Sequence, residues 1–465
     1  MKKIKPINIV YISLLFFSFF VSCYLFLCNE ISNVYGLLFL CPFFFFIITL
    51  VYSNKIINNF TNIGFIFTII LFFIRMVISP LLMGIGGYAS VFSKITRPSI
   101  NYAILLSSFE YLIVVTLIVL ICKNRSKNEN KVGFKSFKSS TAFNAILFIL
   151  TLYLVLVFIF LPQCRLLYRT IFDIKSFDFT TQIYTVPSIS NSAIQRAFLT
   201  LFKMDLDIVR LLLPIKVMIL IKRSIKNNFF GIVFCILLSI SQLMIISSTM
   251  ARAVISCFLL LVFTAKLYPK HKKRIIRYSL YVTLFGIIGY FFVRLNVGSR
   301  YGSTTLDYFC KIMNAYFSGI PNIAASLNIP NGYRISTFFG SLYSAIPFNS
   351  SLFGMKVIKL QNLFNECNNT YGQIVPMISE GNYYFGFILS PVFSVVCSIL
   401  AFKFGDEANK QNDPWHYISY IFISIMFAIA IIMYDMSIIL IWLLEWLVPM
   451  LILSNIAVKK KGEDT

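Results

Sequence analysis

Runs of about twenty apolar residues recur along this chain and constrain its fold more than any other feature. A helix needs about 20 predominantly apolar residues to cross the hydrocarbon core of a bilayer. The runs predict an all-α integral membrane protein with about twelve membrane-spanning helices in one polytopic domain, residues 1–465. The predicted spans are residues 8–28, 34–53, 63–83, 101–122, 143–161, 197–221, 229–248, 251–268, 275–293, 383–403, 415–434 and 437–457.

Composition excludes an ordinary soluble domain. Hydrophobic residues make up 58% of the chain and charged residues 12%, whereas a soluble domain carries about 25% charged residues. Most of the ten cysteines lie inside apolar runs, where they act as small buried hydrophobes. Cys310 and Cys367 fall in a predicted outer loop, as Cys164 does in another, and a Cys310–Cys367 disulfide is one pairing that the sequence allows.

The distribution of Lys and Arg predicts the orientation. Lys2, Lys3 and Lys5 precede a first run that is longer and bulkier than a signal-peptide core, so we expect a retained anchor. With the N-terminus inside, every strongly basic linker falls on the cytoplasmic side, as the positive-inside rule requires, and both termini are cytoplasmic. These linkers are residues 123–142, 266–274 and 458–465. The net charge of +24 is thus spread over separate linkers, which excludes nucleic acid as a partner.

Two outer loops are long, residues 162–196 and 294–382. Loops of such length are usually functional or disordered. The second contains DYFCKIMNAYFSGIP and STFFGSLYSAIPF, apolar stretches with helical spacing that are too short or too polar to span. We expect short amphipathic helices at the membrane interface there. The chain shows no internal repeat, which disfavours a transporter built from two similar halves.

Ionisable residues inside predicted spans are costly and usually functional. They gather in the outer halves of the spans: Arg75, Glu110, Asp207, Arg210, Arg252 and Glu445. Arg75 and Glu110 both lie roughly 12–14 Å below the outer surface, which predicts an ion pair, and Asp207 and Arg210 share a helix face. Such pairs can lock helices together or line a polar cavity open to the outer leaflet. The outward bias favours the cavity, and Lys216, which lies deeper, can extend to the cytoplasmic face.

Arginine predominates among the charges of the outer loops, whereas lysine predominates in the inner linkers. The outer arginines are Arg165, Arg169, Arg196, Arg294, Arg300 and Arg334. A guanidinium group binds phosphate oxygens in a fork of N–H donors, so this bias indicates recognition of an anion. Solvated surface arginine is the alternative interpretation of each one.

Both histidines, His271 and His416, are predicted to be cytoplasmic, so either a carboxylate is the general base at the outer face or the reaction does without one. Glu380 is the best-placed candidate, since it ends the large loop just before a span, and Asp307 is the second. The sequence shows neither a metal-ligand cluster nor a phosphate-cradling glycine loop, so we expect no metal and no cofactor.

Several local phrases carry a family resemblance. They are FIRMVISP with Arg75, STMARAVIS with Arg252, VGSRYGSTT with Arg300, AYFSGIPNIAAS, and YGQIVPMISEGNYYFG with Tyr371 and Glu380. Together with the span count and the large outer loop, they resemble the Wzy polymerases of O-antigen and capsular polysaccharide over most of the chain. The chain lacks a pair of outer-loop motifs of Arg, ten residues and Gly that describes some Wzy proteins. Related ligases use an outer-face histidine, which is also absent here.

The resemblance implies an activity at the outer face of a bacterial cytoplasmic membrane. A Wzy polymerase transfers a glycan from undecaprenyl diphosphate to the non-reducing end of another lipid-linked repeat unit. We hypothesise catalytic roles for Glu380 and Arg300 in such a transfer. We expect substrate binding by Arg75, Arg252, Arg294, Arg334, Arg210, Glu110 and Tyr371. A chain-length regulator and a flippase are the implied protein partners.

Two other functions stay open. A flippase or transporter for lipid-linked oligosaccharide would also have many spans with buried charges, but it would not need a folded outer loop. A ligase-like glycosyltransferase is the other alternative. The sugar and its linkage are not encoded in any recognisable pattern.

Overall fold

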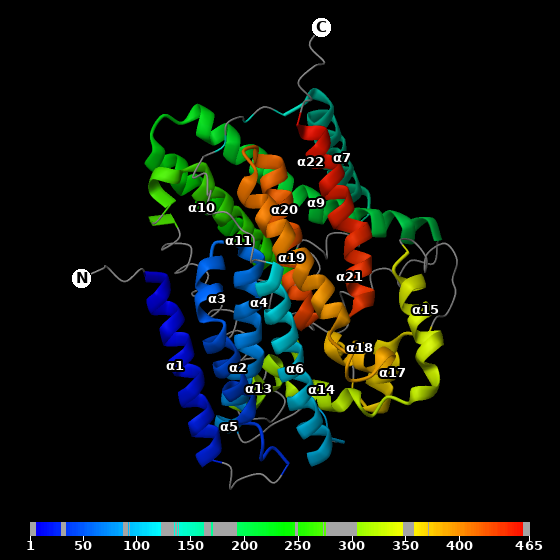
Figure 1. Cartoon of the computed structure of the whole chain (residues 1–465). Coiled ribbons are helices and arrows are strands. Elements are labelled where there is room, and N and C mark those ends of the chain that lie inside the picture. The colour runs from blue at the N-terminus through cyan, green and yellow to red at the C-terminus, as the bar shows by residue number, and fades with distance from the viewer. Residues whose placement is uncertain are drawn as a thin grey trace, which may run out of the picture.

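The computed structural model describes residues 6–28, 34–86, 94–121, 139–161, 193–246, 250–272, 305–346, 358–370 and 372–458, with a few isolated positions between them. These residues are almost entirely helical (Figure 1). The strands among them are β1 (Arg169–Thr170) and β2 (Ile245–Ile246), which form one short antiparallel pair. The all-α fold class is therefore confirmed.

In the part of the chain that the structure describes, six helices are long and apolar enough to cross a membrane. Four are single elements, namely α1 (Pro6–Leu27), α6 (Arg97–Ile121), α7 (Thr141–Phe160) and α20 (Pro414–Met433). Two are composite, and each contains a π-helical turn. One joins α4 (Ile63–Phe73), η2 (Ile74–Ile78) and α5 (Ser79–Ile85), and the other joins α21 (Met436–Trp442), η9 (Leu443–Leu447) and α22 (Val448–Ala457). They indicate a membrane protein.

The other predicted spans differ in the structure. Residues 34–53 contribute to a bent pair, α2 (Leu40–Val51) and α3 (Ser53–Asn59), with a 78° break. Three more form α9 (Ala193–Ser224), α10 (Asn228–Met244) and α11 (Met250–Leu267), which are too polar or too short to count as spans by themselves. The 3-10 turn η6 (Pro269–His271) follows α11. Most of residues 275–293 lies outside the described part of the chain. Twelve spans therefore stay a prediction.

The predicted span 383–403 is wrong in its boundaries. The chain instead forms α18 (Met377–Phe385) and α19 (Val392–Lys410), with Gly386 and Pro391 at the break. Gly386 has a φ of 77°, a left-handed conformation that ends α18 and that residues with a Cβ rarely adopt. Apolar composition alone did not reveal this break, because Phe387, Ile388 and Leu389 continue the apolar run across it.

Small residues let α4, α19 and α20 approach closely at the centre of the bundle. A Cβ added at Gly64 would lie 2.3 Å from the carbonyl oxygen of Ala401. Ser424 of α20 donates a hydrogen bond to that same carbonyl at 2.6 Å. Small residues at helix crossings are the usual means by which membrane helices gain packing contact.

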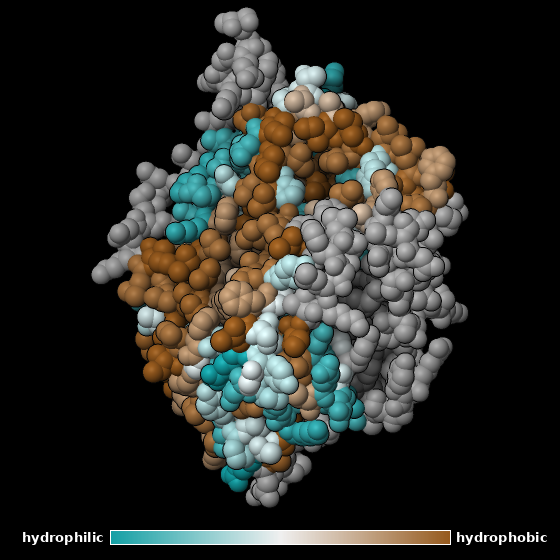
Figure 2. All heavy atoms as spheres, turned by 90° about the vertical axis from the view of Figure 1, so that its right-hand side faces the viewer, coloured by the Kyte–Doolittle hydropathy of each residue, from teal (hydrophilic) through white to brown (hydrophobic). Residues whose placement is uncertain are grey.

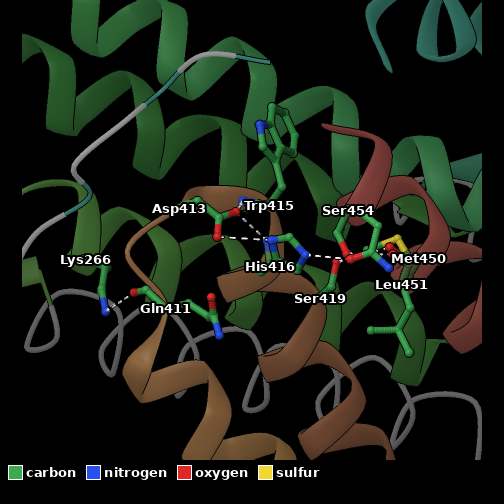
Figure 3. Close-up of polar contacts among 10 residues, drawn as sticks. Lys266, Gln411, Asp413, Trp415, His416, Ser419, Met450, Leu451 and Ser454 are labelled. Atoms are coloured by element: carbon green, nitrogen blue, oxygen red, sulfur yellow. Dashed lines mark hydrogen bonds and ion pairs between the residues drawn. The ribbon is translucent and has the colours of Figure 1, made fainter. Parts of the chain in front are cut away.

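The upper end of the bundle in Figure 1 joins residues in or near the segments that the sequence assigns to the cytoplasmic side. Lys266 Nζ donates to the carbonyl of Gln411 at 3.4 Å, and His416 Nδ1 lies 3.1 Å from Asp413 Oδ2 (Figure 3). His416 Nε2 lies 2.8 Å from Asn455 Oδ1, which ties α20 to α22. Similar contacts join Asn409 to Thr61, Ser140 to Ile456 and Lys216 to Ser139. Lys216 thus reaches this end, as expected.

Part of the long predicted loop 294–382 folds into what we call the loop subdomain, residues 305–346 and 358–382. Its helices are α13 (Thr305–Tyr316), α14 (Ile320–Ser326), the 3-10 turn η8 (Asn331–Tyr333), α15 (Arg334–Ser344), α17 (Leu360–Cys367) and most of α18. A small second core of Phe92, Ala325, Ile329, Leu360, Phe364, Val375 and Tyr383 holds it together. The short helices expected in this loop are confirmed.

The loop subdomain packs on the lower end of the bundle in Figure 1. Asn328 donates to the carbonyl of Lys94 at 3.1 Å. Tyr102 of α6 donates to Asn382 at 2.8 Å, and Ser79 of α5 donates to Asn314 at 2.6 Å. Polar contacts that bridge long sequence separations therefore fix this subdomain to the helices.

The Cys310–Cys367 disulfide does not form. Neither sulfur is part of a disulfide. Cys310 is buried in α13, where its sulfur accepts a hydrogen bond from Asn314 at 3.5 Å. Cys367 instead ends α17, and its carbonyl oxygen contacts Lys94 at 3.4 Å. Cys164 lies outside the described residues.

Candidate active site

Two buried carboxyl groups meet where the loop subdomain contacts the last two helices. Glu380 of α18 is 2% exposed, and Asp435, in the link between α20 and α21, is 4% exposed. Glu380 Oε2 accepts a hydrogen bond from the backbone N–H of Met436 at 2.7 Å. Asp435 Oδ1 accepts from the N–H of Ile438 at 2.9 Å and from the hydroxyl of Ser437 at 2.7 Å. The two acids therefore bind the same turn of backbone.

A helical hairpin places Asp435 at this position. α20 ends at Met433 and α21 begins at Met436, so only two residues link the helices. The helices run side by side, because Ser419 of α20 contacts the carbonyl of Met450 in α22 at 3.4 Å. Asp435 caps the returning helix with its side chain, which is a preferred residue and geometry for a helix start.

Close backbone packing fixes Glu380 from the other side. A Cβ added at Gly381 would lie 2.0 Å from the carbonyl oxygen of Ser390, so α18 rests directly on the chain that leads into α19. Tyr383, one turn further, donates to the carbonyl of Pro330 at 2.9 Å. These contacts anchor α18 at both the start of α19 and the loop subdomain, and they leave Glu380 little freedom.

The carboxyl of Glu380 is expected to hold a proton near neutral pH. Burial and the nearby charge of Asp435 raise the pKa of Glu380 to about 8, although the Met436 N–H opposes this. Burial also raises the pKa of Asp435, against the hydrogen bonds from Ile438 and Ser437. Two buried acids at one place cannot both ionise cheaply. A pKa close to the working pH suits a group that takes and returns a proton.

α15 covers this region with an unusual distribution of side chains. Its buried face carries small residues, Thr337, Gly340 and Ser341, whereas its exposed face carries Ile335, Phe339 and Leu342. Ile335 is 77% exposed and Phe339 63%. From the side on which α15 lies, the surface is apolar over its upper part and polar over much of its lower part (Figure 2). An exposed apolar stripe of this kind fits the boundary of a bilayer.

Arg334 is a predicted binding residue that contacts α18, the helix that carries Glu380. It begins α15, and its Nη2 donates to Asn331 Oδ1 at 3.0 Å. Its guanidinium carbon lies 5.7 Å from the centre of the Tyr383 ring, a cation–π distance. Tyr383 is three residues from Glu380 on α18, so the structure places a predicted cation against the helix that carries the predicted base. Asp307, the second candidate base, lies in the first turn of α13.

The predicted Arg75–Glu110 ion pair is confirmed. Arg75 Nη2 lies 2.5 Å from Glu110 Oε2, and neither side chain is exposed. Ser394 of α19 donates to the other carboxylate oxygen, so the pair joins η2, α6 and α19. Arg75 Nε and Nη1 have no hydrogen-bond partner among the described residues. In this closed arrangement the contacts are those of a helix lock, and a substrate-binding role for either residue stays a prediction.

Arg210 contacts a partner that the sequence did not predict. It is 7% exposed, and its Nε donates to Gln242 Oε1 of α10 at 3.1 Å, while Nη2 donates to the carbonyl of the same residue. Asp205 is 6% exposed, and neither of its carboxylate oxygens has a hydrogen-bond partner within the described ranges. Sequence inspection missed Asp205 because the neighbouring Asp207 has the better spacing to Arg210.

The side chains of four other predicted site residues lie outside the described part of the structure. Arg294, Arg300 and Tyr371 lie outside the described residues. Arg252 lies in the first turn of α11, as expected, but its side chain is not described. Most of loop 162–196 is also outside, and α9 begins at Ala193, three residues before the predicted end of that loop.

Asp435 is the site residue that sequence inspection missed. The sequence marked it only as the boundary between the last two spans. Its signal is a lone acid in an otherwise apolar stretch, flanked by Tyr434 and Met436. Within the described residues, no group of three or more His, Cys, Asp and Glu side chains is placed to hold a metal ion.

Comparison of the chain with protein-family models, with curated protein sequences and with solved structures found no match, so its function has to be argued from its own residues.

Proposed function

We propose that this protein is a membrane-embedded polysaccharide polymerase of the Wzy type. It would transfer a glycan from undecaprenyl diphosphate to the non-reducing end of another lipid-linked repeat unit, at the outer face of a bacterial cytoplasmic membrane. The observation that carries the proposal is the buried Glu380 carboxyl beside Asp435, held at the junction of a folded loop subdomain and the helix bundle. A chain-length regulator and a flippase would act beside it.

The two groups of interhelical contacts support the expected alternation of the linkers between two sides of the membrane. Residues of predicted cytoplasmic linkers contact one another, as Asn409 contacts Thr61 and Lys266 contacts Gln411. Residues of predicted outer segments likewise contact one another, as Asn328 contacts Lys94. Such sorting is expected if the chain crosses the membrane about twelve times with both termini inside. Glu380 then lies at the outer end, where a lipid-linked glycan is presented.

Glu380 has the properties of the general base for this transfer. The attacking sugar hydroxyl would give its proton to the Glu380 carboxylate as its oxygen bonds to the anomeric carbon. The bond between that carbon and the diphosphate oxygen breaks, and its electron pair leaves with the diphosphate. Arginine near the diphosphate stabilises the developing negative charge. Arg300 and Arg252 have this role in the proposal, with Arg334 placed beside α18.

The apolar stripe of α15 supports a lipid-linked substrate. Ile335, Phe339 and Leu342 would face the outer leaflet, while Thr337 and Ser341 face the site. Glu380 is only 2% exposed, so a substrate reaches it only if the helices that cover it move. A polyprenyl-linked glycan arriving within the leaflet would meet α15 first.

Lipid-linked oligosaccharide transport is the second candidate function. The buried Arg75–Glu110 pair favours it, because transporters carry ion pairs between helices. A transporter has no need, however, of a loop subdomain that has its own core and supplies a buried acid. A ligase-like transfer to a different acceptor would use the same groups and differs only in the acceptor.

Deletion of the gene in its host, followed by gel analysis of the surface glycan, tests the proposal. We expect single repeat units on the outer acceptor and no ladder, because export continues and polymerisation stops. Complementation with wild type restores the ladder, whereas Glu380→Gln and Arg300→Ala, at normal expression, do not. Glu366→Gln is the matched control, since Glu366 is an exposed acid on α17. If even the single unit fails to reach the surface, the transport function replaces ours.

A further inference from the structure

We infer that Asp435 is a positioning residue for Glu380, and that the two acids share a single proton whose place on Glu380 is set by the charge that Asp435 holds. The inference rests on the proposed function for its consequence in the reaction. Its structural part, the shared proton, does not need the reaction. Neither the motifs in the sequence nor the proposed mechanism assigns Asp435 a part.

The hydrogen bonds divide the charge between the two acids. Asp435 Oδ1 accepts both the Ile438 N–H and the Ser437 hydroxyl, whereas Glu380 accepts only the Met436 N–H among the residues that the structure describes. Donors stabilise the ionised form of a carboxyl, so the acid with more donors keeps the negative charge. Asp435 is therefore the ionised member, and Glu380 carries the proton.

The surroundings provide little other compensation. Within the described residues, no ion pair joins Lys, Arg or His to either acid. Asp435, in the link before α21, raises the pKa of Glu380, and the Met436 N–H lowers it. Glu380 in turn interacts electrostatically with Tyr384 of α18 and Cys397 of α19. Lys359, at the start of α17, acts on Asp435 and favours its ionised form. The positive charge of Arg334 interacts instead with the hydroxyl of Tyr383 and favours its ionised form. This arrangement again places the charge on Asp435.

Structure alone does not explain the second acid. Asp435 already caps α21, and the Met436 N–H needs only a neutral acceptor, which glutamine would supply. A buried acid next to another acid costs free energy that a purely structural contact would avoid. Paired carboxyls that share a proton are instead a known way to keep one acid protonated at neutral pH. The second acid thus makes Glu380 a stronger base once its proton has left.

The consequence is a specific pH dependence of stability. A carboxyl whose pKa rises on folding binds more protons in the folded protein than in the unfolded chain, so stability falls as pH rises. For Glu380 this fall spans the range from its ordinary pKa of 4.5 to about 8. If Asp435 causes part of the rise, removing its charge ends the fall at a lower pH.

Thermal unfolding of the purified full-length protein in lipid nanodiscs, between pH 5 and pH 9, tests the shared proton. Asp435→Asn keeps the oxygen that caps Ile438 and removes the charge, and Glu380→Gln keeps an acceptor for Met436. We expect Glu380→Gln to flatten the fall in melting temperature. We expect Asp435→Asn to lower the pH at which this fall in melting temperature ends by about one unit. Glu366→Gln should leave the wild-type curve unchanged. Coincident curves for Asp435→Asn and wild type would overturn the inference.

The polymerisation rate of the same preparations tests the link to the reaction. In wild type the rate should rise with pH toward about 8, as Glu380 loses its proton. Asp435→Asn should move this rise to lower pH and reduce the highest rate, because the base becomes weaker. A lower rate with an unmoved pH profile would reduce Asp435 to a structural cap and overturn its positioning role. If wild type fails to polymerise, the proposed function fails, while the melting curves still decide the shared proton.

Discussion

Arg75 and Glu110 form an ion pair at 2.5 Å with no exposure of either side chain, and Ser394 completes it from a third helix. The two residues are 35 positions apart in sequence, and their ion pair joins helices that could otherwise slide past one another in a bilayer. Removing one partner from a buried ion pair leaves an uncompensated charge, which typically costs about 3–5 kcal/mol.

We therefore expect Arg75→Met and Glu110→Leu each to lower the melting temperature and the yield of folded protein strongly. The double variant Arg75→Met/Glu110→Leu should recover most of the stability, because no charge remains buried. Melting in nanodiscs measures this, and a double variant as unstable as the single ones would contradict the lock. If the stable double variant also makes a normal glycan ladder, neither residue binds substrate.

Gly381 sets how closely α18 approaches the start of α19. Gly381→Ala places a methyl group 2.0 Å from the carbonyl of Ser390, so the backbone must shift and Glu380 moves with it. We expect the free energy of unfolding to fall by about 1–3 kcal/mol. We expect the polymerisation rate to fall by more than this loss of stability alone would cause. Gly332→Ala is the matched control, since nothing lies within 4 Å of its added Cβ. Equal ladders from both variants would show that α18 tolerates displacement.

The apolar stripe of α15 should contact lipid. Phe339→Trp adds a tryptophan at a position that is 63% exposed, whereas Asn362→Trp adds one on exposed α17 in the same subdomain. We expect brominated lipids to quench the fluorescence that Phe339→Trp adds to that of the three native tryptophans. The fluorescence added by Asn362→Trp should stay unquenched. Equal quenching, or none at either position, would contradict an interfacial α15.

Asp205 is a buried acid whose two oxygens lack partners among the described residues. Replacing it by asparagine removes the cost of burying a charge, and we expect Asp205→Asn to stabilise the protein by about 1–3 kcal/mol at neutral pH. Glu407→Gln, on the exposed side of α19, should change stability little. A destabilised Asp205→Asn would mean that the ionised form of Asp205 has a partner in the intact protein.

Orientation can be tested with reporter fusions. Alkaline phosphatase is active only outside the cytoplasm, and green fluorescent protein folds well inside it. We expect phosphatase activity from fusions after Asn369, which is exposed in the loop subdomain, and fluorescence from fusions after Lys410. The opposite pattern would invert the predicted topology and move Glu380 to the cytoplasmic face.

Local patterns predicted some of these features correctly. The depth of Arg75 and Glu110 within consecutive runs sufficed to pair them, because helix rise converts residue number directly into depth. The helical spacing in the loop predicted α13 and α15. The break at Gly386 was missed, since Phe387, Ile388 and Leu389 continue the apolar run across it. The 78° bend between α2 and α3, by contrast, lies at the predicted end of a span, where the chain becomes polar.

The sequence by itself determined that this chain is helical and apolar enough for a membrane, and that Glu380 stands out as an acid, because periodicity and composition are local properties. Only the tertiary structure decided that Asp435 is the partner of Glu380. The two are 55 positions apart, and they meet because a two-residue link turns α20 into α21 where α18 packs. Which side chains share a proton depends on that packing, which no stretch of sequence specifies alone.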